Sequence, residues 1–203
     1  MKMKIFALVN NHPLMCAPGP LAEGPLVWDM LPDSCLLRSG NILFLPDLNH
    51  RYEAVPALAV KIGRLGKSVT PRFAHRYVTE VTVALHIRDL TRLDELRQAG
   101  LPWVMAWGFD RSLVTGEFVP VKDFAALSGM TLEVTDTAGG TSMRTSGMYI
   151  DLSYVIEAVS HDNTIKNGDL ILPALAPSGL TLQPGQLLSA SLDGCPLLEV
   201  KIK

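Results

Sequence analysis

Short apolar runs broken by proline and glycine constrain this chain more than any other feature. Near the N-terminus, turn residues separate the runs KIFALV, LVWDM and NILFLP. Later runs with the length and side-chain character of strands are MTLEVTD, DLILPALA, LLSASLD and PLLEVKIK. The last two are joined by Asp193-Gly194, a dipeptide typical of a tight hairpin. The pattern therefore predicts a β-rich chain.

Three short segments are expected to be helical, without the regular strand–helix alternation of a doubly wound sheet. TPRFAHRY starts with Thr70 as the cap and Pro71 at the first helical position. TRLDELRQAGLP has Thr91 as its cap and Gly100 as its stop signal. MYIDLSYVIEAVS has apolar residues at helical spacing. The expected class is β-rich α+β.

One long apolar run, AVPALAVKIG, reads as a largely buried strand in which Pro56 argues for an edge or a bulge. The proline-rich stretch NNHPLMCAPGPLAEGP should be a loop. No repeat or linker divides the 203 residues. We therefore expect one domain, 1–203.

Composition excludes several classes of function. The chain is 48% hydrophobic with a net charge of −2, so it can bury a sizeable core and offers no charge for a nucleic acid. Arg64 and Lys67 fit a solvated turn. The apolar run near the N-terminus is too short for a signal peptide, and no apolar segment reaches the ~20 residues that span a bilayer. Three scattered cysteines (Cys16, Cys35 and Cys195) fit neither a disulfide framework nor a zinc site. We expect a cytoplasmic protein without a membrane partner.

An ordered series of motifs resembles the fumarylacetoacetate hydrolase family. The motifs are PDSCLL, YEA followed by ALAVKIGRLGKSV, RFAHRY, RDLTR, GLPWVMAWGFDRS, TIKNGDLIL and GQLLSASLDGCPLLEVKI. The resemblance implies a mixed β-roll that is usually a homodimer. Residues 1–46 would form an N-terminal strand and lid segment, and residues 47–203 the β-roll core. Family members use Mg²⁺ or Mn²⁺ to act on 1,3-dicarbonyl-type acids as hydrolases, decarboxylases or isomerases.

The family positions that would hold the cation carry apolar residues here. Counting back from KIGRLGK, the two glutamate positions fall on Val55 and Ala57. Counting back from RD, the metal-binding aspartate falls on Ala84. A hard divalent cation needs several oxygen ligands to replace its water. We therefore expect no metal cofactor, whereas Mg²⁺ or Mn²⁺ would be required if the family chemistry survives.

Other functional positions of the family are also altered. The lysine before GFD is Trp107, which either stacks on a ligand or fills the space of the lysine side chain. The carboxylate-binding turn corresponds to ALAP, residues 174–177, or lies one residue earlier, and Ala176 is assigned to the ligand pocket. The lid motif has become NNHPLMCAPG. His12 and Glu23 are the remaining candidates for its acid–base pair.

His86 offers a weak alternative metal site. It lies two residues after Ala84, so it could share that face and bind a transition metal with Glu53 and Asp89. The other interpretation is a hydrogen-bonded structural histidine. Arg88 is assigned to the ligand pocket, and with Asp89 it could form an ion pair that holds the following helix.

Three functions stay open at this stage. The missing carboxylates favour a dimeric pseudoenzyme, either alone or as the partner of an active paralogue in a heteromer, or a small-molecule binding protein. The alternative is an active hydrolase, decarboxylase or isomerase of a small keto acid, of the acylpyruvate or oxaloacetate type, with a rebuilt or metal-free site.

Overall fold

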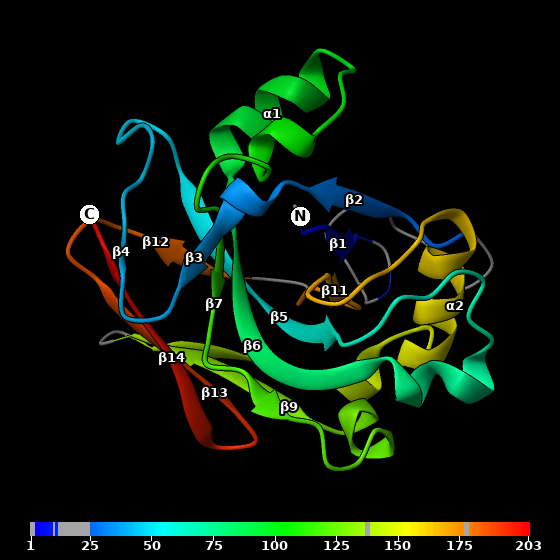
Figure 1. Cartoon of the computed structure of the whole chain (residues 1–203). Coiled ribbons are helices and arrows are strands. Elements are labelled where there is room, and N and C mark those ends of the chain that lie inside the picture. Colours follow the sequence, from blue (N-terminus) through cyan, green and yellow to red (C-terminus); the bar gives the residue numbers. More distant parts are fainter. Residues whose placement is uncertain (1–2, 10, 12–24, 137–138, 177–178) are drawn as a thin grey trace.

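Two mixed β-sheets form the body of the molecule, and a computed structural model describes residues 3–9, 11, 25–136, 139–176 and 179–203 (Figure 1). The larger sheet has the order β2 (Trp28–Leu31), β1 (Ile5–Leu8), β11 (Leu170–Leu172), β5 (Tyr52–Ile62), β6 (Val78–Asp89), β7 (Leu113–Thr115) and β3 (Leu36–Arg38). β12 (Leu180–Leu182) also pairs with β5, and β8 (Val119–Pro120) with β6. The smaller sheet has the order β10 (Gly140–Arg144), β9 (Thr131–Thr135), β13 (Leu187–Leu192), β14 (Cys195–Ile202) and β4 (Ile42–Leu43).

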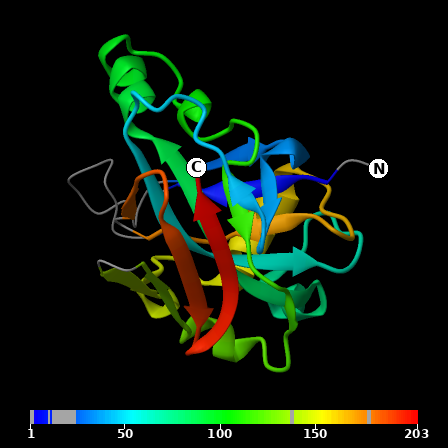
Figure 2. The same cartoon turned by 90° about the vertical axis from the view of Figure 1, so that its left-hand side faces the viewer.

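The strand pair β5–β6 is the centre of the larger sheet. The two strands are antiparallel and stay paired from Tyr52–Asp89 to Ile62–Val78. β6 bends strongly as it crosses the molecule, so the larger sheet is curved rather than flat (Figures 1 and 2). The β-rich class and the mixed sheet agree with the sequence-based prediction.

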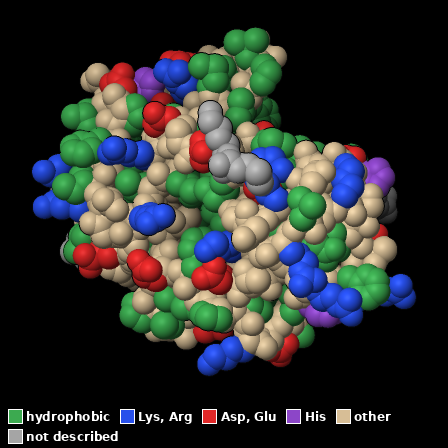
Figure 3. Space-filling view, viewed as in Figure 1, with side chains coloured by type: hydrophobic (Ala, Val, Ile, Leu, Met, Phe, Trp, Pro, Cys, Tyr) green, Lys and Arg blue, Asp and Glu red, His purple; other side chains and the backbone are tan. Residues whose placement is uncertain are grey.

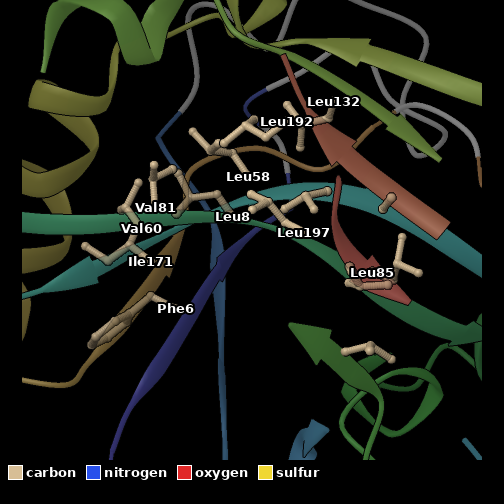
Figure 4. Close-up of a cluster of buried hydrophobic side chains, with 14 of the residues drawn as sticks. Phe6, Leu8, Leu58, Val60, Val81, Leu85, Leu132, Ile171, Leu192 and Leu197 are labelled. Carbon is tan, nitrogen blue, oxygen red and sulfur yellow. The ribbon is translucent and has the colours of Figure 1, made fainter. Parts of the chain in front are cut away.

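One face of the larger sheet packs on the smaller sheet and on α2 (Leu152–Asp162). Alternate residues of β5 and β6, such as Leu58 and Leu85, meet side chains of the smaller sheet, such as Leu132 and Leu192 (Figure 4). This alternation follows from the two-residue period of a strand. The opposite face of β5 and β6 belongs to a second buried cluster. That second face carries the residues considered below.

Pro56 lies inside a central strand, and the register irregularity between β5 and β6 falls at Lys61/Ile62, so the expectation of an edge or a bulge at Pro56 was wrong. The carbonyl of Pro56 accepts a hydrogen bond from the Ala176 main-chain nitrogen (2.8 Å), on the side away from β6. Both main-chain groups of a strand residue point to the same side, so the missing N–H removes no bond to β6. Pro56 lies between the part of β5 that pairs with β12 and the part that pairs with β11.

The helices lie where the sequence places them, and Thr70 precedes the helical residue Pro71 as expected, but the first α-helix begins earlier than predicted. α1 (Leu90–Gln98) is capped by Asp89, whose carboxylate accepts from the Arg92 main-chain nitrogen at 2.9 Å. Thr91 was therefore the wrong cap. The short 3₁₀ segments are η2 (Asp33–Cys35), η3 (Pro71–Arg76), η4 (Val104–Ala106), η5 (Ala125–Ser128) and η6 (Thr145–Gly147). Over the described ranges, no helix is long and apolar enough to cross a membrane.

The predicted hairpin is confirmed. Asp193 and Gly194 join β13 to β14 with φ angles of 48° and 76°. Both values lie in the left-handed region that this class of two-residue turn requires.

Candidate functional site

Three alternate cross-strand pairs of β5 and β6 place the family's functional positions on one face of the larger sheet. They are Glu53 with Arg88, Val55 with His86, and Ala57 with Ala84. In a two-residue period these six side chains point to the same side. The positions assigned from sequence therefore do come together.

The residues at the three expected metal positions do not fit a divalent cation. Val55, Ala57 and Ala84 are all fully buried, with 0% exposure, and none has a donor atom in its side chain. In the part of the chain that the structure describes, no group of three or more His, Cys, Asp or Glu side chains could hold a metal ion. Because Mg²⁺ and Mn²⁺ require several oxygen ligands, this strand pair cannot supply a family-type metal centre.

The charged residues that remain on this face neutralise each other. Nη1 of Arg88 lies 3.5 Å from Oε1 of Glu53, and both side chains are buried. The Arg88 guanidinium also lies 5.8 Å from the centre of the Trp107 ring, within the range of a cation–π contact. Glu53 is therefore engaged with a cation of the protein, which disfavours the alternative metal site at Glu53 and His86.

Asp89 does not take part in either arrangement expected from the sequence. It is next to Arg88 in the strand, so it points to the opposite face. There its carboxylate caps α1 and contacts Nδ1 of His50 at 2.7 Å. The predicted ion pair between Arg88 and Asp89 and the metal set of His86 with Asp89 were therefore wrong.

His86 is the unusual residue of the site. Its side chain is completely buried between Val55 and the Trp107 ring, whose centre is 6.4 Å away. Neither ring nitrogen has a hydrogen-bond partner in the described structure. Desolvation and then the charge of Arg88 lower the pKa of His86 to about 3, and the main chain of Trp107 opposes this without reaching hydrogen-bond geometry. The imidazole is therefore neutral at physiological pH.

Trp107 covers this face from the segment after α1. It follows η4, and its indole Nε1 donates to Oδ2 of Asp29 at 2.8 Å. Trp107 is only 6% exposed, and it lies where the family's lysine was expected. Burial raises the pKa of the Asp29 carboxyl, and the bond from Trp107 partly opposes that effect.

Sequence reasoning did not find Asp29. Asp29 lies on β2, opposite Ala7 and two residues before Leu31, and both of these neighbours belong to the same buried cluster. A carboxyl group inside the short apolar run LVWDM was the signal that could have pointed to it.

The segment corresponding to the family's carboxylate-binding turn also lies against this face. Leu175 forms an isolated bridge with Ala57, and Ala176 is buried. Asn11, the second asparagine of the altered lid motif, is buried and donates to the carbonyls of Ile150 and Pro173. The start of the expected lid is therefore fixed close to this segment. His12 and Glu23 lie outside the described residues.

The two cysteines within the described ranges, Cys35 and Cys195, do not suggest a thiol nucleophile. Cys35 is buried, and burial raises the pKa of its thiol, whereas Cys195 is exposed on β14. A raised pKa leaves less of the reactive thiolate at neutral pH.

A family model for the C-terminal domain of fumarylacetoacetate (FAA) hydrolase matches residues 17–203. The chain belongs to the fumarylacetoacetate hydrolase family. This match confirms the family inferred from the motifs, and the curled mixed sheet is the fold of its structural relatives.

Two curated relatives cover most of the chain. An uncharacterized protein of Pyrococcus horikoshii is 29% identical over 98% of this chain and 87% of its own length. The mitochondrial oxaloacetate tautomerase of Rattus norvegicus is 29% identical over 85% of this chain and 78% of its own.

A solved structure shows the same fold with a metal. Fumarylpyruvate hydrolase of Pseudomonas aeruginosa, in complex with Mn²⁺ and pyruvate, has a TM-score of 0.87 and covers 98% of this chain and 88% of its own. It is 16% identical, so it is evidence for the fold alone. This fumarylacetoacetate hydrolase family member therefore keeps the fold, while Val55, Ala57 and Ala84 stand at the positions where a cation was expected.

Proposed function

We propose that this protein binds a small keto acid and catalyses its keto–enol tautomerisation without a divalent cation at the β5–β6 strand pair. The observation that carries the proposal is the combination on one buried face of apolar side chains at the metal positions with Arg88, His86 and Asp29 around them. An oxaloacetate tautomerase among the relatives supports this substrate class.

Tautomerisation is the reaction of this family that depends least on a Lewis acid. Hydrolysis of a C–C bond needs an activated water and a stabilised carbanion, and decarboxylation needs an acceptor for the electron pair. Tautomerisation needs only the removal of one proton and the return of another. A site that has lost its cation but kept proton-transfer groups is therefore best suited to this reaction.

The residues of the face suggest separate roles. Arg88 is a buried cation that can hold the carboxylate of the substrate, with Trp107 packed against the same guanidinium. Asp29 is a carboxyl group whose pKa is raised by burial, and a carboxyl group beside the substrate can take up and return a proton. Both residues are linked through Trp107.

A non-catalytic binding protein is the second candidate. It is favoured by the same apolar residues, Val55, Ala57 and Ala84, because they remove the electrophile that the family reaction uses. In that case this face of the sheet would hold a keto acid without turnover, or the chain would pair with an active paralogue.

The decisive experiment follows the loss of the enol form of oxaloacetate by ultraviolet absorbance, with the chelator EDTA present throughout. The account expects the purified protein to accelerate this decay over buffer, equally with and without EDTA. Arg88→Leu should abolish the acceleration, whereas Arg51→Leu, an exposed arginine paired with Asp94, should not. No acceleration by the natural chain would favour the binding protein. Acceleration that disappears in EDTA would contradict a metal-free site.

The assembly and compartment are further parts of the proposal. We expect a homodimer in the cytoplasm, and light scattering should give about twice the 22.1 kDa of one chain. On the face shown in Figure 3, acidic and basic side chains are interspersed over much of the surface. This mixture supports a small-molecule ligand rather than a polyanion.

A further inference from the structure

We propose that His86 is a ligand-binding residue that donates a hydrogen bond to the keto or enolate oxygen of the substrate, in the place of the cation. The proposal rests on the proposed substrate class and does not require turnover. It assigns a role to a residue for which the family resemblance implied none.

The position of His86 is the first argument. Its cross-strand neighbour is Val55, and Ala84 lies two residues before it on the same face. Two of the three positions expected to hold a cation therefore flank the imidazole directly. A group that replaces the cation as the partner of a substrate oxygen has to lie here, because the sheet fixes where that oxygen can be reached.

The unsatisfied hydrogen bonds are the second argument. A buried polar atom without a partner is costly, and folded proteins avoid it unless the group has a use. Both ring nitrogens of His86 lack a partner among the described residues, although the side chain has no exposed surface. A ligand oxygen at one nitrogen would remove part of that cost, so ligand binding is favoured by the state of the free protein.

The chemistry of the surroundings selects the ligand. Arg88, two residues along the same face, provides the positive charge for a carboxylate, and its pairing with Glu53 is long at 3.5 Å. A neutral imidazole beside it can donate its N–H to a second oxygen two bonds away from the carboxylate. A 2-keto acid or its enolate has oxygens in this arrangement, whereas a simple carboxylic acid lacks the second one.

Trp107 must move for such a ligand to enter, because its ring covers His86 edge-on. This movement would break the indole hydrogen bond to the partly exposed Asp29 and the contact with the Arg88 guanidinium.

The test measures binding by calorimetry in EDTA, so that it is independent of turnover. The probes are oxalate, a planar stable mimic of the pyruvate enolate, and propionate, which has the carboxylate but no second oxygen. The variants are His86→Phe, which keeps a ring against Trp107, and His86→Gln, which keeps a donor and an acceptor. The matched control is Thr82→Val, a fully buried polar position on the same face of the same strand.

The inference predicts a specific pattern. His86→Phe should bind oxalate at least tenfold more weakly than the natural chain, and His86→Gln should recover part of the loss. Propionate should bind the natural chain and His86→Phe equally weakly. Thr82→Val should leave oxalate binding unchanged. In the absence of ligand, His86→Phe should melt at the same or a higher temperature, because it removes the unsatisfied nitrogens. A merely structural histidine would give a lower melting temperature and unchanged oxalate affinity.

Each remaining outcome also decides the question. Equal oxalate binding by the natural chain and His86→Phe overturns the inference, even if tautomerisation is observed. His86-dependent binding without turnover supports the inference while rejecting the proposed tautomerase. If His86→Phe does not fold, two other measurements test the role of His86. His86→Gln should bind oxalate more weakly than the natural chain, and the nitrogen-15 shifts of the His86 ring should change when oxalate is added. Absence of oxalate binding by the natural chain rejects the inference outright.

Discussion

His50 and His86 lie near opposite faces of the same strand pair, and their surroundings change their pKa values in opposite directions. Asp89 holds His50 in a 2.7 Å contact, which raises the pKa of that imidazole, with smaller contributions from the charges of Asp89 and Asp47. Burial without a partner lowers the pKa of His86 to about 3. The first histidine favours its protonated form and the second its neutral form, so each should leave a distinct trace in the dependence of stability on pH.

His86 should destabilise the protein in acid. Between its unfolded pKa of about 6.5 and its folded pKa of about 3, the unfolded chain takes up a proton that the folded chain rejects. In this window the free energy of unfolding should decrease as the pH is lowered, by at most about 1.4 kcal/mol per pH unit from this residue. Urea unfolding of the natural chain and His86→Phe from pH 7 to pH 4 measures the difference. Parallel curves for the two proteins would contradict the neutral buried imidazole.

His50 should act with the opposite sign. Because its folded pKa is raised, its stabilising contribution is complete below the unfolded value and is lost as the pH rises through the folded value. His50→Gln should therefore cost about 0.5–1 kcal/mol at pH 5.5, as for a partly screened pair, and less at pH 8.5. Denaturant titrations at these two pH values provide the measurement, with the exposed His75→Gln as the control. A cost that is larger at pH 8.5 would disprove the assignment.

At the scale of elements, the junction between β6 and α1 depends on Asp89. This carboxylate caps the helix and binds His50, so one side chain joins a strand, a helix and the loop before β5. The other face of the same strand end carries Arg88 and the site. Arg88 and Asp89 therefore make their contacts on opposite faces of the strand and do not form an ion pair with each other.

Asp89→Ala should destabilise the protein by about 1–2 kcal/mol through loss of the cap, with a further loss below pH 6.5 from His50. Asp94→Ala is the matched control, because Asp94 lies on the same helix in a half-exposed ion pair with Arg51. That control should change the stability by less than about 0.5 kcal/mol. Chemical denaturation at pH 7 compares the two variants. Equal effects would show that the cap contributes no more than a surface ion pair.

The elements also show what could be predicted from sequence. Periodicity and turn chemistry located β5, both α-helices and the Asp193-Gly194 hairpin, because these features depend on neighbouring residues. The position of Pro56 in a central strand was not predicted. It depends on how β11 and β12, from the far end of the chain, pair with β5 on either side of Pro56. Asp29, on β2, was missed for the same reason, since its partner Trp107 lies 78 residues away.

At the scale of the whole molecule, the family fold carries different residues at the positions where a cation was expected. The family positions were assigned by counting from motifs, and the strand register places them on one face, as expected. What counting could not give was the pairing of Glu53 with Arg88 or the isolation of His86, which are properties of the assembled face. We propose that this face, with Val55, Ala57 and Ala84, works without a divalent cation.

Manganese content per chain tests that claim most directly. The protein is incubated with excess Mn²⁺, desalted, and analysed for metal beside a triple variant, Val55→Glu with Ala57→Glu and Ala84→Asp. The variant should melt lower in chelator, because three clustered carboxylates repel each other, and should be stabilised by Mn²⁺. The account predicts far less than one Mn²⁺ per natural chain and no change in its melting temperature. Close to one Mn²⁺ per natural chain, with a higher melting temperature, would contradict it.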